Sequence, residues 1–261
     1  MIILLFAVTG IFAGFAAGLF GVGGGLVVVP ALLALFAIKG LDPAFSVHLA
    51  IGTSLATIVV TSLSSTLSHH QKGNVDWDVL KRYGLGLVLG ATLGAVTADL
   101  TPGPTLRVGF GLFAWAMALQ LAFGGQPKPT RKVPGLLGLS ASGSVVGWIS
   151  SLFGIGGGAM TVPYLILHNV ATKRAVGTSA AAGLPIALAG AISYLAVGLD
   201  AQGLPDYSLG YVYLPAFFSI VLLSVPMAKL GASVATRLEP KLLKRCFAGF
   251  LTVVGASLVF G

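Results

Sequence analysis

The sequence predicts an all-helical integral membrane protein made of two related halves in opposite orientations. Three observations carry this prediction. The chain of 261 residues is 56% hydrophobic and only 8% charged, whereas soluble domains carry about 25% charged residues. Long stretches, such as 1–38 and 133–172, contain no Asp, Glu, Lys or Arg, and a bilayer span needs roughly 20 apolar residues. A glycine-rich motif also occurs twice, which indicates an internal duplication.

Ten apolar segments are expected, five in each half. In the first half they are 2–20, 24–38, 44–68, 80–98 and 104–123. In the second half they are 135–153, 157–170, 174–197, 208–228 and 242–260. The polar, proline-rich stretch 125–134 reads as a cytoplasmic surface linker, so we expect a first transmembrane repeat over 1–124 and a second, inverted repeat over 135–261. The segment that follows each glycine motif is shorter than a full span.

The first glycine motif covers residues 19–25, and the second covers residues 152–158 at an offset of 133 residues. Their glycines are Gly21, Gly23, Gly24 and Gly25 in the first copy, and Gly154, Gly156, Gly157 and Gly158 in the second. Consecutive glycines disfavour helix, and broken helices in both halves indicate a transporter binding site. Glycine N–H groups at the start of a new helix favour an anion. The alternative is a tight helix crossing without a ligand.

A second repeated element is a Gly-Thr-Ser triplet inside the third segment of each half. The two copies are Gly52, Thr53 and Ser54, and Gly177, Thr178 and Ser179. These hydroxyls are candidates for substrate binding, with bonds to the helix's own carbonyl groups as the alternative. His48 precedes the first triplet and Lys173 stands in its place in the second half. Both are candidate relays for a proton or an anion, with anchoring at the membrane interface as the simpler role.

Glycines at four-residue spacing form stripes along two other segments. One stripe is Gly10, Gly14 and Gly18, and the other is Gly86, Gly90 and Gly94. Small residues at this spacing let helix backbones approach closely in a membrane. We expect the stripes to pack against other helices rather than to take part in transport.

The distribution of basic residues predicts the topology. The short segments after the glycine motifs are either tilted partial spans or halves of re-entrant hairpins, and both give the same alternation of sides. With the N-terminus outside and the side alternating after each segment, thirteen of the fifteen lysines and arginines lie on the inner side, and only Lys39 and Arg107 lie outside. Basic residues concentrate in cytoplasmic loops. An odd number of segments in each half places the halves in opposite orientations. We therefore expect a multi-pass protein of the inner (plasma) membrane with both termini outside the cytoplasm.

Several function classes are disfavoured by composition. The net charge of +8 comes from short loops and serves topology, so no nucleic-acid partner is expected. The sequence has one cysteine, Cys246, and no cluster of His or carboxylate ligands, so no metal site and no cofactor are expected. The expected partners are a small anionic substrate and the lipid bilayer. The oligomeric state stays open, with a homodimer as one option.

The doubled glycine motif, each copy followed by a Gly-Thr-Ser triplet, resembles the TauE/SafE family of sulfite and organosulfonate permeases. The resemblance covers nearly the whole chain. It implies transport of sulfur-containing anions such as sulfite, sulfoacetate or thiosulfate without ATP. It also implies a substrate site formed by residues 21–25, 52–54, 154–158 and 177–179.

These observations lead to one functional hypothesis and two rivals. The hypothesis is a secondary transporter that moves a small sulfur-containing anion by alternating access at a midplane site between inverted repeats. An anion channel would share the site without saturable counterflow. An intramembrane serine hydrolase is disfavoured, because His48 and Ser54 lie about 120° apart around one helix and the Gly-x-Ser-x-Gly elbow is absent. The protein is therefore not expected to be an enzyme.

Overall fold

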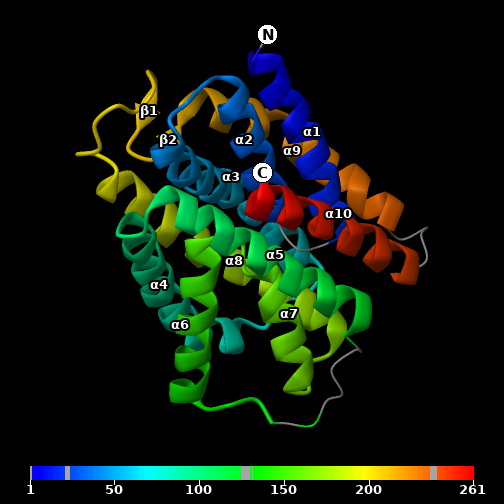
Figure 1. Cartoon of the computed structure of the whole chain (residues 1–261). Helices are drawn as coiled ribbons and strands as arrows, with labels where there is room; N and C mark the ends of the chain where they lie inside the picture. Colours follow the sequence, from blue (N-terminus) through cyan, green and yellow to red (C-terminus); the bar gives the residue numbers. More distant parts are fainter. Residues whose placement is uncertain (1, 21–23, 125–129, 131, 236–239) are drawn as a thin grey trace.

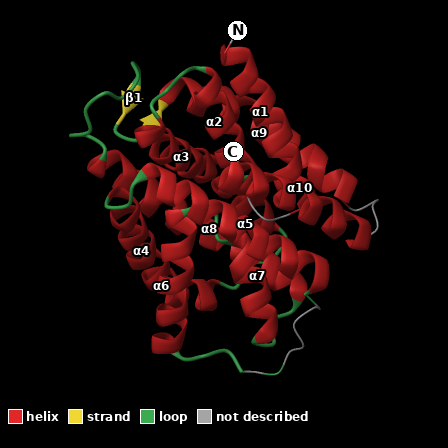
Figure 2. Ribbon diagram, in the orientation of Figure 1, coloured by secondary structure: helices red, strands yellow, loops and turns green. Residues whose placement is uncertain are grey.

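The computed structural model describes residues 2–20, 24–124, 130, 132–235 and 240–261. Within these residues it has ten helices and one two-stranded hairpin (Figure 2). The helices of the first half are α1 (Ile2–Phe20), α2 (Gly25–Ile38), α3 (Pro43–Gln71), α4 (Trp77–Asp99) and α5 (Gly103–Phe123). Those of the second half are α6 (Leu136–Leu152), α7 (Gly158–Leu167), α8 (Thr172–Val197), α9 (Leu214–Ala235) and α10 (Pro240–Phe260). The hairpin consists of β1 (Ser208–Leu209) and β2 (Val212–Tyr213).

The all-helical membrane class is confirmed. Five helices, α3, α4, α5, α8 and α9, are long and apolar enough to cross a membrane. The helices after the glycine motifs are short, with 14 residues in α2 and 10 in α7. At 1.5 Å per residue, α7 extends only about 15 Å, or half of the hydrocarbon core. It therefore cannot cross the bilayer alone.

The expected helix over 208–228 is wrong at its start. Residues 208–213 form the hairpin, and α9 begins at Leu214. Two residues in this region have positive φ, Tyr207 at 66° and Gly210 at 52°, a conformation that a helix excludes. The hairpin brings the backbone of Tyr211 and Tyr213 against α3. These contacts hold residues 208–213 in the hairpin instead of a helix.

The glycine stripes pack helices from different halves together, as expected. Gly10 and Gly14 of α1 lie against the backbone of Ile220 and Ser224 in α9. On the other side of the molecule, α4 lies beside α6 (Figure 1). There the glycines Gly86, Gly90 and Gly94 contact the backbone of Ser140, Ser144 and Trp148. A Cβ atom at these positions would collide with backbone, so glycine is needed for the close approach.

The contacts of the two halves are equivalent. Gly10 meets the backbone of Ile220, and Gly143, at the same position in the second half, meets the backbone of Tyr83. The first helix of each half thus packs against the fourth helix of the other. At the centre, α3 packs against α8, while α5 and α10 pair on one flank (Figure 1). The halves are therefore interlocked, and neither forms a separate body.

Candidate functional site

The two glycine motifs meet at the centre of the protein. A Cβ atom on Gly25 would collide with the carbonyl oxygen of Gly154 and lie 2.9 Å from the Cα of Ile155. The side chain of Ile155 is fully buried. Gly21 and Gly23, which the sequence placed in the site, lie outside the described residues. The contact between Gly25 and Gly154 brings one predicted element of each half together.

The second glycine motif has a backbone that requires glycine. Gly154 and Gly157 have φ angles of 67° and 71°, in the left-handed region where a side chain is disfavoured. The Ser54 hydroxyl of α3 donates a hydrogen bond of 2.9 Å to the Gly154 carbonyl. On the opposite side, Gly183 of α8 packs against the carbonyl oxygen of Gly156. The two central helices therefore hold the motif in place.

The start of α7 presents N–H groups without partners. Gly157 is the N-cap of α7 and no side chain caps this helix. The first N–H groups of a helix have no partner within it. Among the described residues, the N–H groups of Gly156, Gly157, Gly158 and Ala159 donate to no backbone carbonyl. Four successive N–H groups at a positive helix end form a site suited to an anion.

Buried hydroxyl groups lie beside these N–H groups. A Cβ atom on Gly157 would be 3.4 Å from Ser150 Oγ and 3.7 Å from Thr161 Oγ1. The side chains of Ser150, Thr161 and Tyr83 are fully buried, and their hydroxyls have no hydrogen-bond partner outside this cluster. The Tyr83 hydroxyl lies near that of Thr161. Because buried polar groups are normally satisfied, this cluster indicates a place where a ligand can bind.

Motif spacing alone does not reveal this cluster, although comparison of the two halves contains the signal. At the offset of 133 residues, Ser150 and Thr161 correspond to Ala17 and Val28. Tyr83 corresponds to Ile220, because Gly143 contacts Tyr83 as Gly10 contacts Ile220. Around the second glycine motif, three hydroxyls thus stand where apolar residues stand around the first: Ser150 and Thr161 belong to the second half, and Tyr83 belongs to the first. Duplicated positions that differ in polarity are the signal that the repeated motifs alone do not give.

The threonines of the two triplets make equivalent contacts within the protein. The Tyr213 N–H donates to Thr53 Oγ1 at 2.9 Å, and the Asp76 N–H donates to Thr178 Oγ1 at 2.8 Å. The preceding glycines, Gly52 and Gly177, pack against the carbonyl oxygens of Tyr211 and Asn74, respectively. Each triplet therefore holds the segment that leads into the fourth helix of the other half, α9 for Thr53 and α4 for Thr178. Their role in binding a substrate stays a prediction.

The serines of the triplets differ from each other. Ser54 bonds the second glycine motif, whereas Ser179 Oγ is buried and has no hydrogen-bond partner. Ser179 is 2% exposed. Of the four triplet hydroxyls, only that of Ser179 is thus left without a protein partner for a substrate to satisfy.

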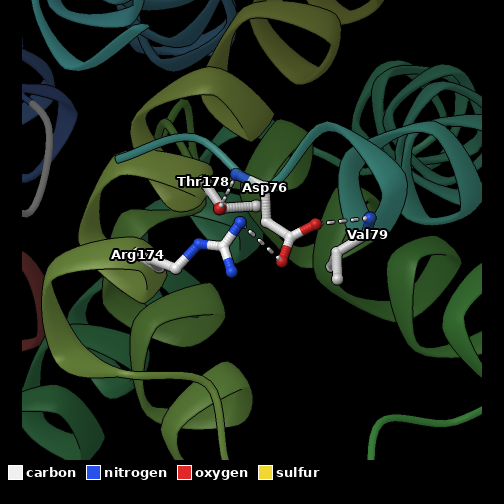
Figure 3. A network of polar contacts seen from close by, with 4 residues as sticks. All are labelled: Asp76, Val79, Arg174 and Thr178. Atoms are coloured by element: carbon white, nitrogen blue, oxygen red, sulfur yellow. Dashed lines mark hydrogen bonds and ion pairs between the residues drawn. The ribbon is translucent and has the colours of Figure 1, made fainter. Parts of the chain in front are cut away.

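The second triplet also belongs to a polar network at the start of α4 (Figure 3). The Asp76 carboxylate accepts a hydrogen bond of 3.2 Å from the Val79 N–H and so caps α4. Its other oxygen lies 3.6 Å from the Arg174 guanidinium, which is 56% exposed. The first half has Leu49 at the position of Arg174, so this ion pair is a feature of the second triplet alone.

The two candidate relay residues lie in different surroundings. His48 is 4% exposed, its Nε2 lies 2.9 Å from the Ala98 carbonyl, and its Nδ1 has no partner. The His48 ring packs against Tyr211, whose hydroxyl donates to the Asp99 carboxylate. Burial, together with this carboxylate, raises the pKa of Tyr211. Lys173 is exposed, so the structure does not bring it into the buried site.

The space beside the first motif is small in this conformation. A cavity of about 10 Å³ is lined by Gly24, Val28, Ala17 and neighbouring residues of α1, α3 and α9. This volume holds about one water molecule. Binding of a larger anion there requires the surrounding helices to move apart.

The chain resembles several curated proteins over nearly its full length. It is 35% identical over 257 residues to a "Probable membrane transporter protein" of Haemophilus influenzae, covering 98% of this chain and 97% of that protein. It is 29% identical over 261 residues to one of Methanocaldococcus jannaschii, covering 99% and 96%. It is 28% identical over 284 residues to the "Probable membrane transporter protein YunE" of Bacillus subtilis, covering 100% and 98%.

No solved structure matches the chain. The family model described as "Sulfite exporter TauE/SafE" matches residues 6–258. This match agrees with the resemblance seen in the glycine motifs and triplets. The chain therefore belongs to the sulfite exporter TauE/SafE family and is a multi-pass membrane transporter.

Proposed function

We propose that this transporter carries a small sulfur-containing anion, such as sulfite, thiosulfate or an organosulfonate, by alternating access between two inverted repeats. The observation that carries the proposal is the group of four unpartnered N–H groups, Gly156 to Ala159, where the two glycine motifs meet. Helix N-termini that point at anionic groups are a common device of secondary transporters. The family's description as sulfite exporters supports sulfur oxyanions as the substrate class.

A gated carrier fits the geometry better than an open channel. The hydroxyl groups beside the second motif are fully buried, and the cavity of about 10 Å³ beside the first motif does not admit an oxyanion, so entry of the anion needs a conformational change. Packing between the halves depends on helix pairs related by duplication, α1 with α9 and α6 with α4. Rocking of these pairs against the central helices α3 and α8 would open the site alternately to each side.

The enzyme alternative finds no support in the described residues. Ser54 donates to the Gly154 carbonyl, and His48 bonds the Ala98 carbonyl through Nε2. A serine nucleophile needs a hydrogen bond to its base, and these two side chains bond different groups instead.

Transport by the purified protein in liposomes tests the proposal. Vesicles loaded with unlabelled sulfite should accumulate labelled sulfite added outside, and this counterflow should saturate as the outside concentration rises. An anion channel would give uptake that follows the electrochemical gradient without counterflow. Failure to move sulfite, thiosulfate or any organosulfonate would contradict the proposal.

The inverted topology has its own test. We expect the loop at Lys72 to face the cytoplasm and the loop at Gln202 to face outward. A single cysteine at either position, in a Cys246→Ser background, is labelled in intact cells with a membrane-impermeant thiol reagent. Both positions are exposed, and they avoid the neighbouring Gly73 and Gly203, whose φ is positive. Only the cysteine at 202 should react, and labelling at 72 would contradict the inverted repeats.

A further inference from the structure

The second glycine motif sits in surroundings that carry no fixed charge. The side chains that contact its glycines are aliphatic or bear hydroxyl groups, and those that contact its Phe153 are aromatic. The sequence places no Asp, Glu, Lys or Arg within 43–71, 133–172 or 175–199, which include α3, α6, α7 and most of α8. The first motif, which packs against it, is also uncharged in sequence. The attraction for an anion must therefore come from N–H groups, hydroxyls and the helix end.

The charge of the ligand matters strongly in such a site. The cost of removing an ion from water rises with the square of its charge, and a buried ion without a counter-charge is costly. A helix N-terminus offers only about half a positive charge. The interaction with this partial charge can offset much of the desolvation free energy of a monoanion. For a dianion, most of the desolvation free energy is not offset.

The hydroxyl cluster adds donors and acceptors in one place. Ser150, Thr161 and Tyr83 are fully buried, the Tyr83 and Thr161 hydroxyls lie within reach of each other, and none of the three has a hydrogen-bond partner outside the cluster. Each hydroxyl can donate a hydrogen bond to an anion oxygen or accept a hydrogen bond from a protonated group of the ligand. A sulfonate offers three oxygens to these donors, and bisulfite also carries a proton that a hydroxyl oxygen can accept.

We propose that the hydroxyl cluster of Ser150, Thr161 and Tyr83, together with the N–H groups at the start of α7, selects monoanionic sulfur oxyanions over dianions. The preferred ligands are then bisulfite and organosulfonates. This narrows the substrates proposed above, because the dianions thiosulfate and sulfate are rejected. This inference rests on the proposed function, since it specifies the form of the anion that the transporter binds. It places the selective site at the second glycine motif, where Tyr83 of the first half joins Ser150 and Thr161 of the second.

Titration calorimetry on the purified protein tests the selectivity with a matched pair of ligands. Methanesulfonate and sulfate are both tetrahedral and similar in size, but they carry one and two negative charges. Methanesulfonate should bind at least about 10-fold more tightly, a difference that corresponds to about 1.4 kcal/mol. Sulfite affinity should fall as pH rises and bisulfite loses its proton, while methanesulfonate affinity stays constant.

Hydroxyl-removing variants test the location. Ser150→Ala, Thr161→Val and the nearly isosteric Tyr83→Phe should each weaken methanesulfonate binding by about 10- to 150-fold, the range for a hydrogen bond to a charged group. The control is Thr66→Val, which removes a buried hydroxyl already bonded to the Ala180 carbonyl and should leave the affinity unchanged. Unchanged affinity in all three cluster variants would overturn the location.

The outcomes separate this inference from the proposed function. Sulfate binding as tight as methanesulfonate binding would overturn the selectivity and leave sulfur-anion transport standing. Absence of binding and counterflow for every sulfur anion would overturn the proposed function and this inference with it.

Discussion

The two glycine motifs share a sequence but differ in backbone and surroundings. Gly24 has a φ of −68°, in the right-handed helical region, whereas its counterpart Gly157 has a φ of 71°. A Cβ atom on Gly24 would meet only Val28, Ala13 and Ala17 at ordinary distances of 3.7–3.8 Å. Around Gly157 the equivalent contacts are the Ser150 and Thr161 hydroxyls. Duplication therefore preserved the break in the helix, and the polar site is found in one copy only.

The largest expected effect is the loss of transport when Gly157 of the second motif is replaced by valine. Gly157→Val forces a side chain into positive φ and against Ile186, whose Cδ1 lies 2.5 Å from the Cβ position. We expect transport to be abolished while the protein still inserts and elutes as a single peak. Gly24→Ala, the matched change in the first motif, should keep most of the counterflow. Equal loss in both variants would show that the motifs act alike.

That pair corrects one expectation from the sequence. The repeated motif predicts that valine is excluded at both Gly24 and Gly157, because a β-carbon would fill the group of N–H donors and disfavour positive φ. The negative φ of Gly24 removes this reason. Within the described part of the first motif, glycine is required at Gly25 instead, because its Cβ would strike the Gly154 carbonyl oxygen.

An intermediate effect is expected from the two triplet serines. Ser54→Ala removes the hydroxyl that bonds the buried Gly154 carbonyl, and an unsatisfied buried group costs about 1–3 kcal/mol. Ser179→Ala removes a hydroxyl without a partner, so stability should change little. Thermal unfolding of both variants in detergent measures the difference. A larger loss for Ser179→Ala would mean that its hydroxyl has a structural bond.

The smallest effect is expected at the edge of the second triplet. Arg174→Leu introduces the residue that the first half has at this position, Leu49. The ion pair with Asp76 is 3.6 Å long and its arginine is 56% exposed, so its loss should cost less than about 1 kcal/mol. Thr178→Val, which removes the acceptor for the Asp76 N–H, should cost more. If thermal unfolding shows a larger loss of stability for Arg174→Leu than for Thr178→Val, the ion pair is the stronger of the two contacts to Asp76.

Much of the fold is readable from the sequence, and the reasons are physical. Charge-free stretches predict the helices because the bilayer demands apolar spans, and the ten expected segments correspond to the ten helices in the described residues. The stripe at Gly86, Gly90 and Gly94 predicts a close helix contact because only a missing side chain permits one. The start of α9 is not readable, because Tyr211 and Tyr213 are apolar enough for a span but are drawn into a hairpin by contacts with α3.

The site is less readable than the fold. The motif glycines mark the broken helices, and the structure brings Gly25 and Gly154 together. The threonine hydroxyls, Thr53 and Thr178, look like ligands in the sequence, yet each accepts a backbone N–H from a distant segment. Ser150 and Thr161 lie on either side of the motif without a pattern of their own. In the sequence they are marked only by their apolar counterparts in the first half, Ala17 and Val28, and their burial beside Gly157 is seen only in the three-dimensional structure.

The most direct test of the central claim is a crystal structure with selenite in place of sulfite, because selenium can be located by its anomalous scattering. We predict one anomalous peak at the start of α7, within hydrogen-bond distance of the N–H groups of Gly157 and Gly158 and of the Ser150 hydroxyl. A peak elsewhere in a protein that transports sulfite, for example beside Arg174, would contradict the account and move the anion site away from the second glycine motif.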